Sequence, residues 1–481
     1  MNSVHLLTTA LLLNCLGRAF AADAGASHPN VLFIVVDDLN TELGCYGNPV
    51  VKSPNIDRLA ARGVRFDHAY CQYSLCNPSR ASFLSGRRPE SSGVYALRTD
   101  VRTAMPDAVM LPQLFRQNGY FCAGAGKVHH GKTQIDPRWW DFYEDGPGED
   151  AGEIAAIKER YGGGDGTPRA YPLDSDGMHT RDGLNARNIN ARLEEHARTG
   201  KPFFLAAGFH KPHLPWTAPR RFFDLYPAGS IPEPASSTMH NVPDVALQTE
   251  LSGFTAPKSR TEAIAGYYAC ISFTDENIGL LLDTLDRTHL WETTLVVLLS
   301  DNGWHLGDHG GLWSKLTLFE NGTRVPLIFA GAGVPKGQVV TQPVELLDVY
   351  PTLADLAGLK APPGLEGKSL VPTMKPGQPP DPAARAYSLI YHYDAAGNSD
   401  ILGRSVKTST YRYTEWSNKQ QDRELYFAGQ EPADENNLAD QTEAAGQQQE
   451  GAGLLRQFKQ PKPGIAERPR ALLKDGKTNK H

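Results

Sequence analysis

The short segment with the clearest chemical content runs Cys76-Asn77-Pro78-Ser79-Arg80 and continues to Gly86. Proline suits the first turn of a helix because its missing N–H would have no partner there, and Gly86 suits the C-terminal stop. The pattern therefore predicts a short helix with Cys76 at its N-terminus. Free backbone N–H groups and the helix dipole favour a bound anion at that end. A structural cysteine before an ordinary helix would give the same five residues, so the rest of the chain must decide.

Four apolar runs elsewhere in the chain stop abruptly at residues that carry chemistry. They are 31–36 before Asp37-Asp38, 121–126 before Lys127 with His129-His130 beyond, 203–209 before His210 and His213, and 295–299 before Asp301-Asn302. Continuous apolar runs of this length are typical of strands buried on both faces of a parallel sheet. Helical patterns separate them, at 55–62, 108–118, 182–198 and 263–287. Strands that alternate with helices predict an α/β fold with a large, mostly parallel sheet flanked by helices.

Two of these strand ends supply four oxygen-bearing side chains, namely those of Asp37, Asp38, Asp301 and Asn302. Ligands of α/β proteins bind beyond the carboxyl ends of the strands, so these side chains are expected to converge. Clustered carboxylates repel one another unless a cation neutralises them, and hard cations prefer oxygen ligands. Either pair alone is best read as a strand-end cap. Together, with a predicted anion site between them, they favour a metal site.

Lysines and histidines complete the set of residues that could do chemistry. Gly126-Lys127 is not a phosphate-binding loop, because Phe121 stands where that motif needs glycine and Val128 replaces its Ser/Thr. A lysine directly after a buried strand is nevertheless expected to face a ligand. One of His210 and His213 could protonate a leaving alcohol, while the other could be structural. Lys315, in a Gly- and Trp-rich loop after Asp301, could bind an anion.

The remaining sequence indicates further organisation. Residues 133–180 are rich in Gly, Asp and Pro and predict an irregular insertion, and 344–358 predicts a helix. Short strand patterns at 387–391, 403–407, 411–416 and 424–427 predict a small antiparallel sheet. We therefore expect an N-terminal domain over 28–375, a C-terminal subdomain over 385–458, and a mobile tail over 460–481.

Composition and the first residues limit the class of protein. The chain has 481 residues, a net charge of −6 and 40% hydrophobic residues, which fits a folded protein and offers no basic field for nucleic acid. An apolar stretch followed by Ala19-Phe20-Ala21 predicts a signal peptide over 1–22, with an N-terminal anchor as the alternative. No stretch is long enough for a stable membrane span. Six scattered cysteines, at 15, 45, 71, 76, 122 and 270, are too few for a disulfide-built scaffold.

Taken together, these segments resemble the type I sulfatases, a formylglycine-dependent family of the alkaline-phosphatase-like superfamily. Among them the chain is most similar to iduronate-2-sulfatases. The similarity covers most of residues 29–440, in order. It is carried by the segments 30–39, 43–47, 53–59, 76–89, 126–131, 209–215, 300–309 and 324–329, and in the C-terminal part by 403–405, 411–414 and 424–427.

The resemblance implies a role for each matching residue. Asp37, Asp38, Cys76, Asp301 and Asn302 would lie at a Ca²⁺ ion, and Cys76 would be oxidised to formylglycine (3-oxoalanine), whose hydrate attacks sulfur. Asp301 would take the proton of that nucleophile, and His210 would act as the acid toward the leaving sugar oxygen. His130 would deprotonate the second hydroxyl of the hydrate and so expel sulfate, with His129 as the other candidate. The remaining cations are Arg80, Lys127 and Lys315, which would orient the hydrate and hold the sulfate.

The resemblance also implies partners and a location. The expected substrate is a sulfated oligosaccharide carrying a 2-O-sulfate on a terminal uronic acid, and maturation would need a formylglycine-generating enzyme. The protein would be secreted or periplasmic, or lysosomal in a eukaryote. Three alternatives stay open: another carbohydrate or aryl sulfatase, a phosphodiester or phosphonate hydrolase of the same superfamily, and an inactive protein that binds sulfated glycans. Asn302 departs from the pattern of the iduronate-2-sulfatases, which often carry histidine there.

Overall fold

The computed structural model describes residues 28–131, 135–145, 170–227, 229–232, 238–248, 260–393, 400–430 and 433–462. The predicted signal peptide, most of the predicted tail and most of the predicted 133–180 insertion lie outside these residues. The described ends of that insertion contain two short strands, β4 (Phe142–Glu144) and β5 (Ala170–Leu173).

A nine-stranded mixed sheet forms the centre of the molecule. Its strands are β1 (Asn30–Asp37), β2 (Gly63–Tyr70), β3 (Phe121–Gly126), β4, β6 (Phe203–Pro212), β8 (Thr294–Ser300), β11 (Arg324–Gly331), β12 (Gln338–Val340) and β13 (Val344–Glu345). Their order is β12-β2-β11-β8-β1-β6-β3-β4, and β13 also pairs with β2. Within this sheet, the described pairings are parallel except for those of β11 with its neighbours β2 and β8. The predicted mostly parallel sheet is therefore confirmed, and all four apolar runs predicted for it fall on strands.

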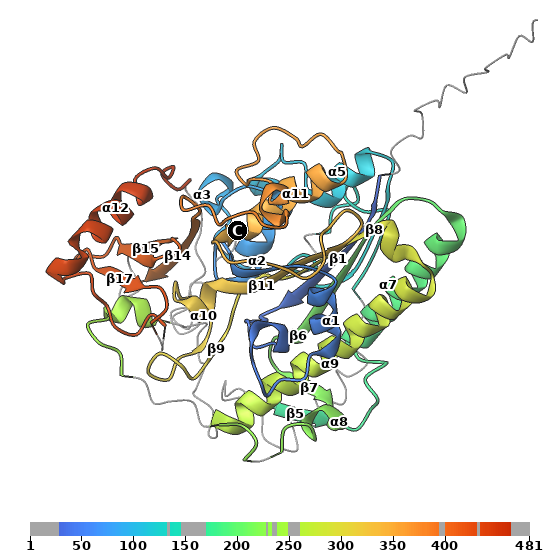
Figure 1. Ribbon diagram of the computed structural model, residues 1–481, viewed down its shortest axis with the longest axis horizontal. Helices are drawn as coiled ribbons and strands as arrows, with labels where there is room; N and C mark the ends of the chain where they lie inside the picture. The colour runs from blue at the N-terminus through green and yellow to red at the C-terminus, as the bar shows by residue number, and fades with distance from the viewer. Residues whose placement is uncertain are drawn as a thin grey trace, which may run out of the picture.

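Helices cover both faces of this sheet, so that it forms the middle of three layers (Figure 1). Alternate residues of β1 point to opposite faces, because side chains of a strand alternate. Val31, Phe33 and Val35 pack with α2 (Cys76–Ser85), α5 (Leu111–Gln117) and α11 (Val349–Leu356). Leu32, Ile34 and Val36 pack with α1 (Pro54–Ala61), α7 (Arg181–Thr199) and α9 (Arg260–Arg287). The four helical patterns predicted between the strands correspond to α1, α5, α7 and α9.

Helix α2 has the bounds that its sequence predicts. It begins at Cys76, and every one of its residues is buried. Gly86 follows it in the left-handed conformation, with φ of 65°, and a Cβ there would lie 2.6 Å from Leu365 Cδ2. Glycine is favoured at this position because of its left-handed backbone conformation. Gly86 therefore ends α2, and Cys76 lies at the other end of this ten-residue helix.

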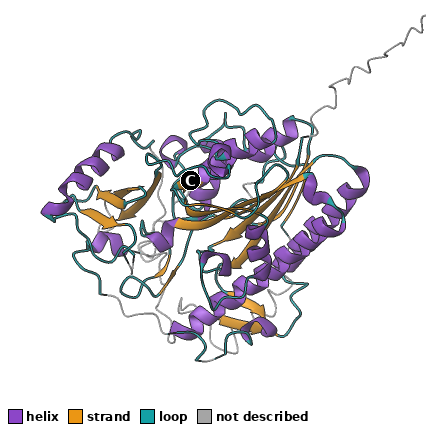
Figure 2. Ribbon diagram, in the orientation of Figure 1, coloured by secondary structure: helices purple, strands orange, loops and turns teal. Residues whose placement is uncertain are grey.

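A second, four-stranded antiparallel sheet lies beside the main body, at the left of Figure 2. Its strands, in order, are β14 (Ala386–Tyr393), β15 (Asp400–Lys407), β16 (Tyr411–Trp416) and β17 (Arg423–Phe427). Helix α12 (Ala445–Leu455) packs on it. This is the small C-terminal sheet that the sequence predicts. The domain boundaries drawn around it stay a prediction.

The remaining short elements connect these layers or support the site. The helices are α3 (Pro89–Ser92), α4 (Val101–Ala104), α8 (Arg220–Phe223) and α10 (Glu320–Thr323), and the strands are β7 (Trp216–Pro219), β9 (His305–Leu306) and β10 (Trp313–Ser314). The 3-10 turns are Gly44–Tyr46, Asp244–Leu247, Leu290–Glu292, Leu346–Asp348, Val371–Met374 and Thr442–Ala444. None of the described helices is long and apolar enough to cross a membrane. The five described cysteines are free.

One predicted element begins differently. The sequence predicts a helix over 344–358, but Val344 and Glu345 form β13 and the α-helix begins only at Val349. Val344 and Glu345 pair in parallel with Ala69 and Tyr70 of β2. These backbone hydrogen bonds to a distant strand outweigh the local helical pattern, and that pairing cannot be read from residues 344–358 alone.

Candidate active site

The carboxylates at the ends of β1 and β8 meet because these two strands are parallel neighbours. Val36 pairs with Ser300, so the residues after each strand emerge at the same edge of the sheet. Asp38 has a left-handed φ of 59°, and its backbone N–H donates to Asp301 Oδ1 at 3.1 Å. A backbone conformation this rare outside glycine persists where the surroundings hold it, which is common at functional sites.

The resulting cluster fits a hard cation. Asp37, Asp38 and Asp301 are fully buried, and one oxygen of each lies within 4.8 Å of the others. Asn302 joins them, since its Nδ2 donates to Asp38 Oδ1 at 2.8 Å. Asp38 Oδ2 and Asn302 Oδ1 are buried acceptors without a hydrogen-bond partner among the described residues. Buried acceptors of this kind are costly without a partner, and a divalent cation with oxygen ligands would satisfy both.

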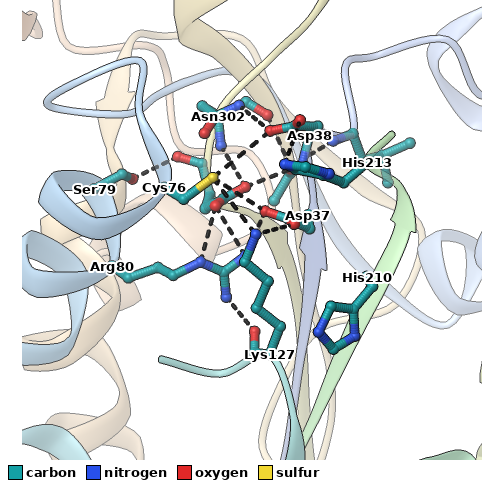
Figure 3. Close-up of polar contacts among 12 residues, drawn as sticks. Asp37, Asp38, Cys76, Ser79, Arg80, Lys127, His210, His213 and Asn302 are labelled. Carbon is teal, nitrogen blue, oxygen red and sulfur yellow. Dashed lines mark hydrogen bonds and ion pairs between the residues drawn. The ribbon is translucent and has the colours of Figure 1, made fainter. Parts of the chain in front are cut away.

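Cys76 lies against this cluster, as Figure 3 shows. Its Sγ is 3.4 Å from Asp37 Oδ1, 2.9 Å from Lys315 Nζ and 3.7 Å from Lys127 Nζ. Burial raises the pKa of the Cys76 thiol, and the Asp37 carboxylate raises it further. The lysines only partly offset this, so the unmodified side chain is a neutral thiol at neutral pH and a poor nucleophile.

Arg80 cross-links the carboxylates from one turn further along α2. Its side chain is 1% exposed, and its Nη2 lies 3.0 Å from Asp37 Oδ1 and 2.8 Å from Asp301 Oδ2. Another guanidinium nitrogen donates to the backbone carbonyls of Lys127 and Val128. The guanidinium group therefore holds the ends of β1, β3 and β8 together through its fixed geometry of donors.

The site is electrically balanced before any cation binds. Asp37 forms an ion pair with Lys127, and Asp38 forms one with Lys315. Three carboxylates thus face three side-chain cations, those of Arg80, Lys127 and Lys315. A bound divalent cation would make this group of side chains positive by two charges. Such a site would attract an anionic ester.

Burial and the neighbouring cations shift the pKa values of the three carboxylates in different directions. Burial opposes ionisation of Asp37, but Lys127, His213 and Arg80 outweigh it and hold the pKa well below the ordinary value. Burial raises the pKa of Asp301 to about 6, only partly offset by Arg80. Burial also raises the pKa of Asp38 against the opposing effect of Lys315. Asp301 is therefore the carboxylate of this cluster best suited to take up a proton near neutral pH.

His129 and His130 lie in different surroundings. His129 Nε2 accepts a hydrogen bond from Trp140 Nε1 at 3.0 Å, and its ring packs 5.0 Å from that of Trp139. His130 has a buried Nδ1 without a partner among the described residues. Burial lowers the pKa of His130 to about 3, and Lys127 contributes next. His130 is thus a neutral imidazole with an available nitrogen, while His129 is held in an aromatic cluster.

The structure also distinguishes His210 from His213. His210 Nδ1 lies 3.1 Å from Asp182 Oδ1, and Asp182 accepts the backbone N–H groups of His210 and Lys211 as well. His213 donates from Nδ1 to the carbonyl of Leu214 at 2.7 Å, and its Nε2 lies 3.7 Å from Asp38 Oδ2. In Figure 3 the ring of His213 lies beside Asp38, whereas that of His210 lies away from Cys76. His213 is therefore the histidine of this segment that contacts the carboxylate cluster.

Most of the predicted residues are thus brought together, from sequence positions up to 278 apart between Asp37 and Lys315. Asp37, Asp38, Cys76, Arg80, Lys127, Asp301, Asn302 and Lys315 form one connected set of contacts. Asp182, which anchors His210, was missed by sequence reasoning. It begins the predicted helix 182–198, where an acidic residue is ordinarily a helix-end residue and gives no separate signal.

Comparison with known proteins agrees with this geometry. The sulfatase family model matches residues 29–359, and the C-terminal model of N-sulphoglucosamine sulphohydrolase matches 307–460. The chain belongs to the sulfatase family. A sulfatase of Formosa agariphila is 34% identical over 420 residues, covering 81% of this chain and 79% of that protein. Human iduronate 2-sulfatase is 31% identical over 522 residues, covering 88% and 93%.

Solved structures show the same fold. A phosphonate monoester hydrolase of Agrobacterium radiobacter superposes with a TM-score of 0.72, at 21% identity, over 89% of this chain and 95% of that one. At this identity the likeness establishes the alkaline-phosphatase-like fold alone. The likeness confirms the predicted fold, and the family match and the curated relatives confirm the predicted class of enzyme, a sulfatase similar to iduronate 2-sulfatases.

Proposed function

We propose that this sulfatase removes sulfate from a sulfated glycan, and specifically the 2-O-sulfate of a terminal uronic acid. The observation that carries the proposal is the contact set around Cys76, in which three carboxylates and three cations surround one buried side chain at a helix N-terminus. The similarity to human iduronate 2-sulfatase over 88% of the chain supports the choice of sugar and position.

The proposed cofactor is Ca²⁺, held by Asp37, Asp38, Asp301 and Asn302 next to residue 76. The four side chains present oxygen donors, and two of those oxygens are buried without a hydrogen-bond partner among the described residues. When bound, the ion would supply positive charge that stabilises the negative charge of the reacting sulfate group. Lys127 and Lys315, which now pair with Asp37 and Asp38, would then have ammonium protons available for sulfate oxygens.

The proposed nucleophile is Cys76 after oxidation to formylglycine by a formylglycine-generating enzyme. The raised pKa of the unmodified thiol argues against a thiolate nucleophile at this position. The modified residue would supply a hydrated aldehyde, whose second hydroxyl provides a route to release sulfate that an ordinary ester of serine lacks. Its neighbours Arg80 and Lys127 would orient it.

The remaining residues are proposed to move protons. The resemblance to sulfatases assigns Asp301 to accept the proton of the nucleophile, and that assignment stays a prediction. His130, whose buried Nδ1 has no partner among the described residues, would act as the second base. The resemblance to sulfatases assigns the acid to His210, and that assignment stays a prediction. We propose His213 instead, because its Nε2 lies 3.7 Å from Asp38 Oδ2 and one of its ring nitrogens lies within 4.8 Å of the Cys76 sulfur.

The predicted signal peptide supports export, so we propose a secreted or periplasmic enzyme. The unit that carries the site would be the predicted N-terminal domain over 28–375, with the 385–458 subdomain contributing beside it.

Sulfate release is the measurement that tests this function. Protein co-expressed with a formylglycine-generating enzyme and loaded with calcium would be given oligosaccharides ending in a 2-O-sulfated uronate. A parallel set would carry only hexosamine 4- or 6-O-sulfate, and an aryl sulfate and its phosphonate analogue would complete the panel. Release from the uronate alone is expected. Release only from the other sugars would refute the uronate assignment, and faster turnover of the phosphonate would refute the sulfate ester as the substrate.

A further inference from the structure

Lys315 is held in an unusual stretch of backbone. Its side chain is 1% exposed, and its ammonium group contacts both Asp38 and Cys76. The residues on either side of it, Ser314 and Leu316, have left-handed φ values of 83° and 70°. Two such residues flanking a buried lysine are unfavourable by themselves, so other contacts must hold this segment in place.

Those contacts centre on Asp308. Its Oδ2 accepts hydrogen bonds from His305 Nδ1 at 2.6 Å, from His309 Nδ1 at 2.7 Å and from Asn321 Nδ2 at 2.5 Å. Its Oδ1 accepts the backbone N–H of Leu306 at 2.9 Å. Burial alone would raise the pKa of Asp308, but His305 and His309 outweigh it and hold the pKa well below its ordinary value. One ionised carboxylate thus gathers donors from the hairpin and from α10.

His305 connects this carboxylate to Lys315. In the β9–β10 hairpin, His305 pairs with Ser314, which directly precedes Lys315. The other ring nitrogen of His305 lies 2.7 Å from Thr317 Oγ1, two residues beyond Lys315. Asp308 also closes the turn of the hairpin, because its carbonyl accepts the N–H groups of Gly311 and Leu312. The backbone of Lys315 is therefore bracketed by contacts of one histidine, and Asp308 fixes that histidine.

We propose that Asp308 is a positioning residue that sets the place of Lys315 in the active site, through His305, His309 and Asn321. The inference rests on the proposed function, since it assigns Lys315 to sulfate binding. The cluster is anchored on its far side as well. Helix α10 carries Asn321, and its Glu320 receives Arg412 of the C-terminal sheet at 2.5 Å.

A metal site is the other reading of this cluster, since His305, Asp308 and His309 offer donors within 4.8 Å of one another. The two N···O distances of 2.6 and 2.7 Å are those of hydrogen bonds, and Asp308 Oδ2 already accepts three. The Asp308 carboxylate is therefore satisfied by hydrogen bonds without an added ion, and His309 Nε2 is left as a buried nitrogen with no partner among the described residues.

The test compares Asp308→Asn with two other variants. The amide keeps the shape of Asp308 but loses its charge and turns an NH₂ group toward donors. Inorganic sulfate binding by calorimetry is the first readout, and turnover of an aryl sulfate is the second. Asp308→Asn is expected to weaken sulfate binding about tenfold or more, the size usual for loss of an outer-shell partner. Lys315→Ala should do the same, and adding Asp308→Asn to it should cause no further loss.

Asp141→Asn is the matched control. The side chain of Asp141 is 31% exposed, against 24% for Asp308. It accepts a hydrogen bond from the backbone N–H of Cys122 and forms an ion pair with Arg116. Asp141 contacts the first residues of β3, whereas Lys127 follows the last residue of that strand. This variant should bind sulfate as the wild type does, and thermal unfolding would show that all variants are folded.

Three results would overturn the proposal. They are unchanged sulfate binding in Asp308→Asn, an equal loss in Asp141→Asn, and a further loss when Asp308→Asn is added to Lys315→Ala. If the wild-type protein binds sulfate but hydrolyses no sulfate ester, the proposed function fails. A selective loss of sulfate binding in Asp308→Asn would still support the positioning role in that case.

Discussion

Replacing His213 with asparagine separates the two histidines that could protonate the leaving group. The Nδ2 group of asparagine can still donate to the Leu214 carbonyl, which His213 contacts at 2.7 Å, so the loop should keep its conformation. What disappears is Nε2, the atom 3.7 Å from Asp38 Oδ2. The side chain of His213 is 36% exposed, so a substrate could reach it.

The size of the effect follows from the chemistry of the leaving group. A positioned acid contributes about 10²- to 10⁴-fold in rate, or about 3 to 5 kcal/mol. We expect the lower end here, because burial and the nearby Lys127 hold the pKa of His213 well below its ordinary value. Little imidazolium then exists before an anionic substrate binds. Alkoxide leaving groups need the proton, whereas 4-nitrophenolate is a stable anion and does not.

The assay measures kcat/KM for wild type, His213→Asn and His210→Asn on a sugar sulfate and on 4-nitrophenyl sulfate. His213→Asn should lose about 100-fold on the sugar and less than about tenfold on the aryl ester. An equal loss on both substrates would refute the role of His213 as acid. A selective loss on the sugar in His210→Asn alone would assign the acid to His210, as the sequence predicts.

Three further predictions concern the metal, the nucleophile and stability. Calcium at about 100 times its dissociation constant should add about 2.7 kcal/mol to the free energy of unfolding, so a chelator should lower the melting temperature. Adding calcium to Asp38→Asn should change its melting temperature little. An equal response of the wild type and the variant would place the ion elsewhere. Cys76→Ser should abolish sulfate release with a melting temperature close to that of the wild type, and retained turnover would contradict a modified nucleophile. Burial lowers the pKa of His392 to about 3, so the unfolded chain takes up the proton first and His392 destabilises the protein as pH falls below 6.5. From pH 7 to pH 5 this lowers the free energy of unfolding by about 2 kcal/mol. The free energy of unfolding of His392→Phe should therefore fall less over that range than that of the wild type. Equal decreases in both proteins would show that the histidine is not kept neutral.

That most of the candidate residues lie together could be predicted from the sequence because the relevant signals are local. The buried strands are recognisable as apolar runs, and each strand stops at the residue where polarity returns. Parallel strands share one functional edge, so the sequence alone predicts that Asp37 and Asp301 meet. The Cys76–Gly86 segment likewise carries its own helix start and stop, and both are confirmed.

Contacts between distant segments could not be predicted in this way. By sequence Asp182 is an ordinary acidic residue at a helix start, and only the fold places it under His210. The pairing of Val344 and Glu345 with β2 replaces the first turn of a predicted helix.

The sequence by itself therefore determined the elements, the edge of the sheet where the site lies, and the residue types that line it. The tertiary structure decided which nitrogen or oxygen faces which partner: His129 inside an aromatic cluster, His213 against Asp38, and Lys315 beside Cys76. The physical reason is the range of the interactions involved. Strand and helix patterns arise from neighbours within a few residues, whereas hydrogen bonds and ion pairs at the site join side chains whose relative position depends on the packing of the whole sheet and its helices.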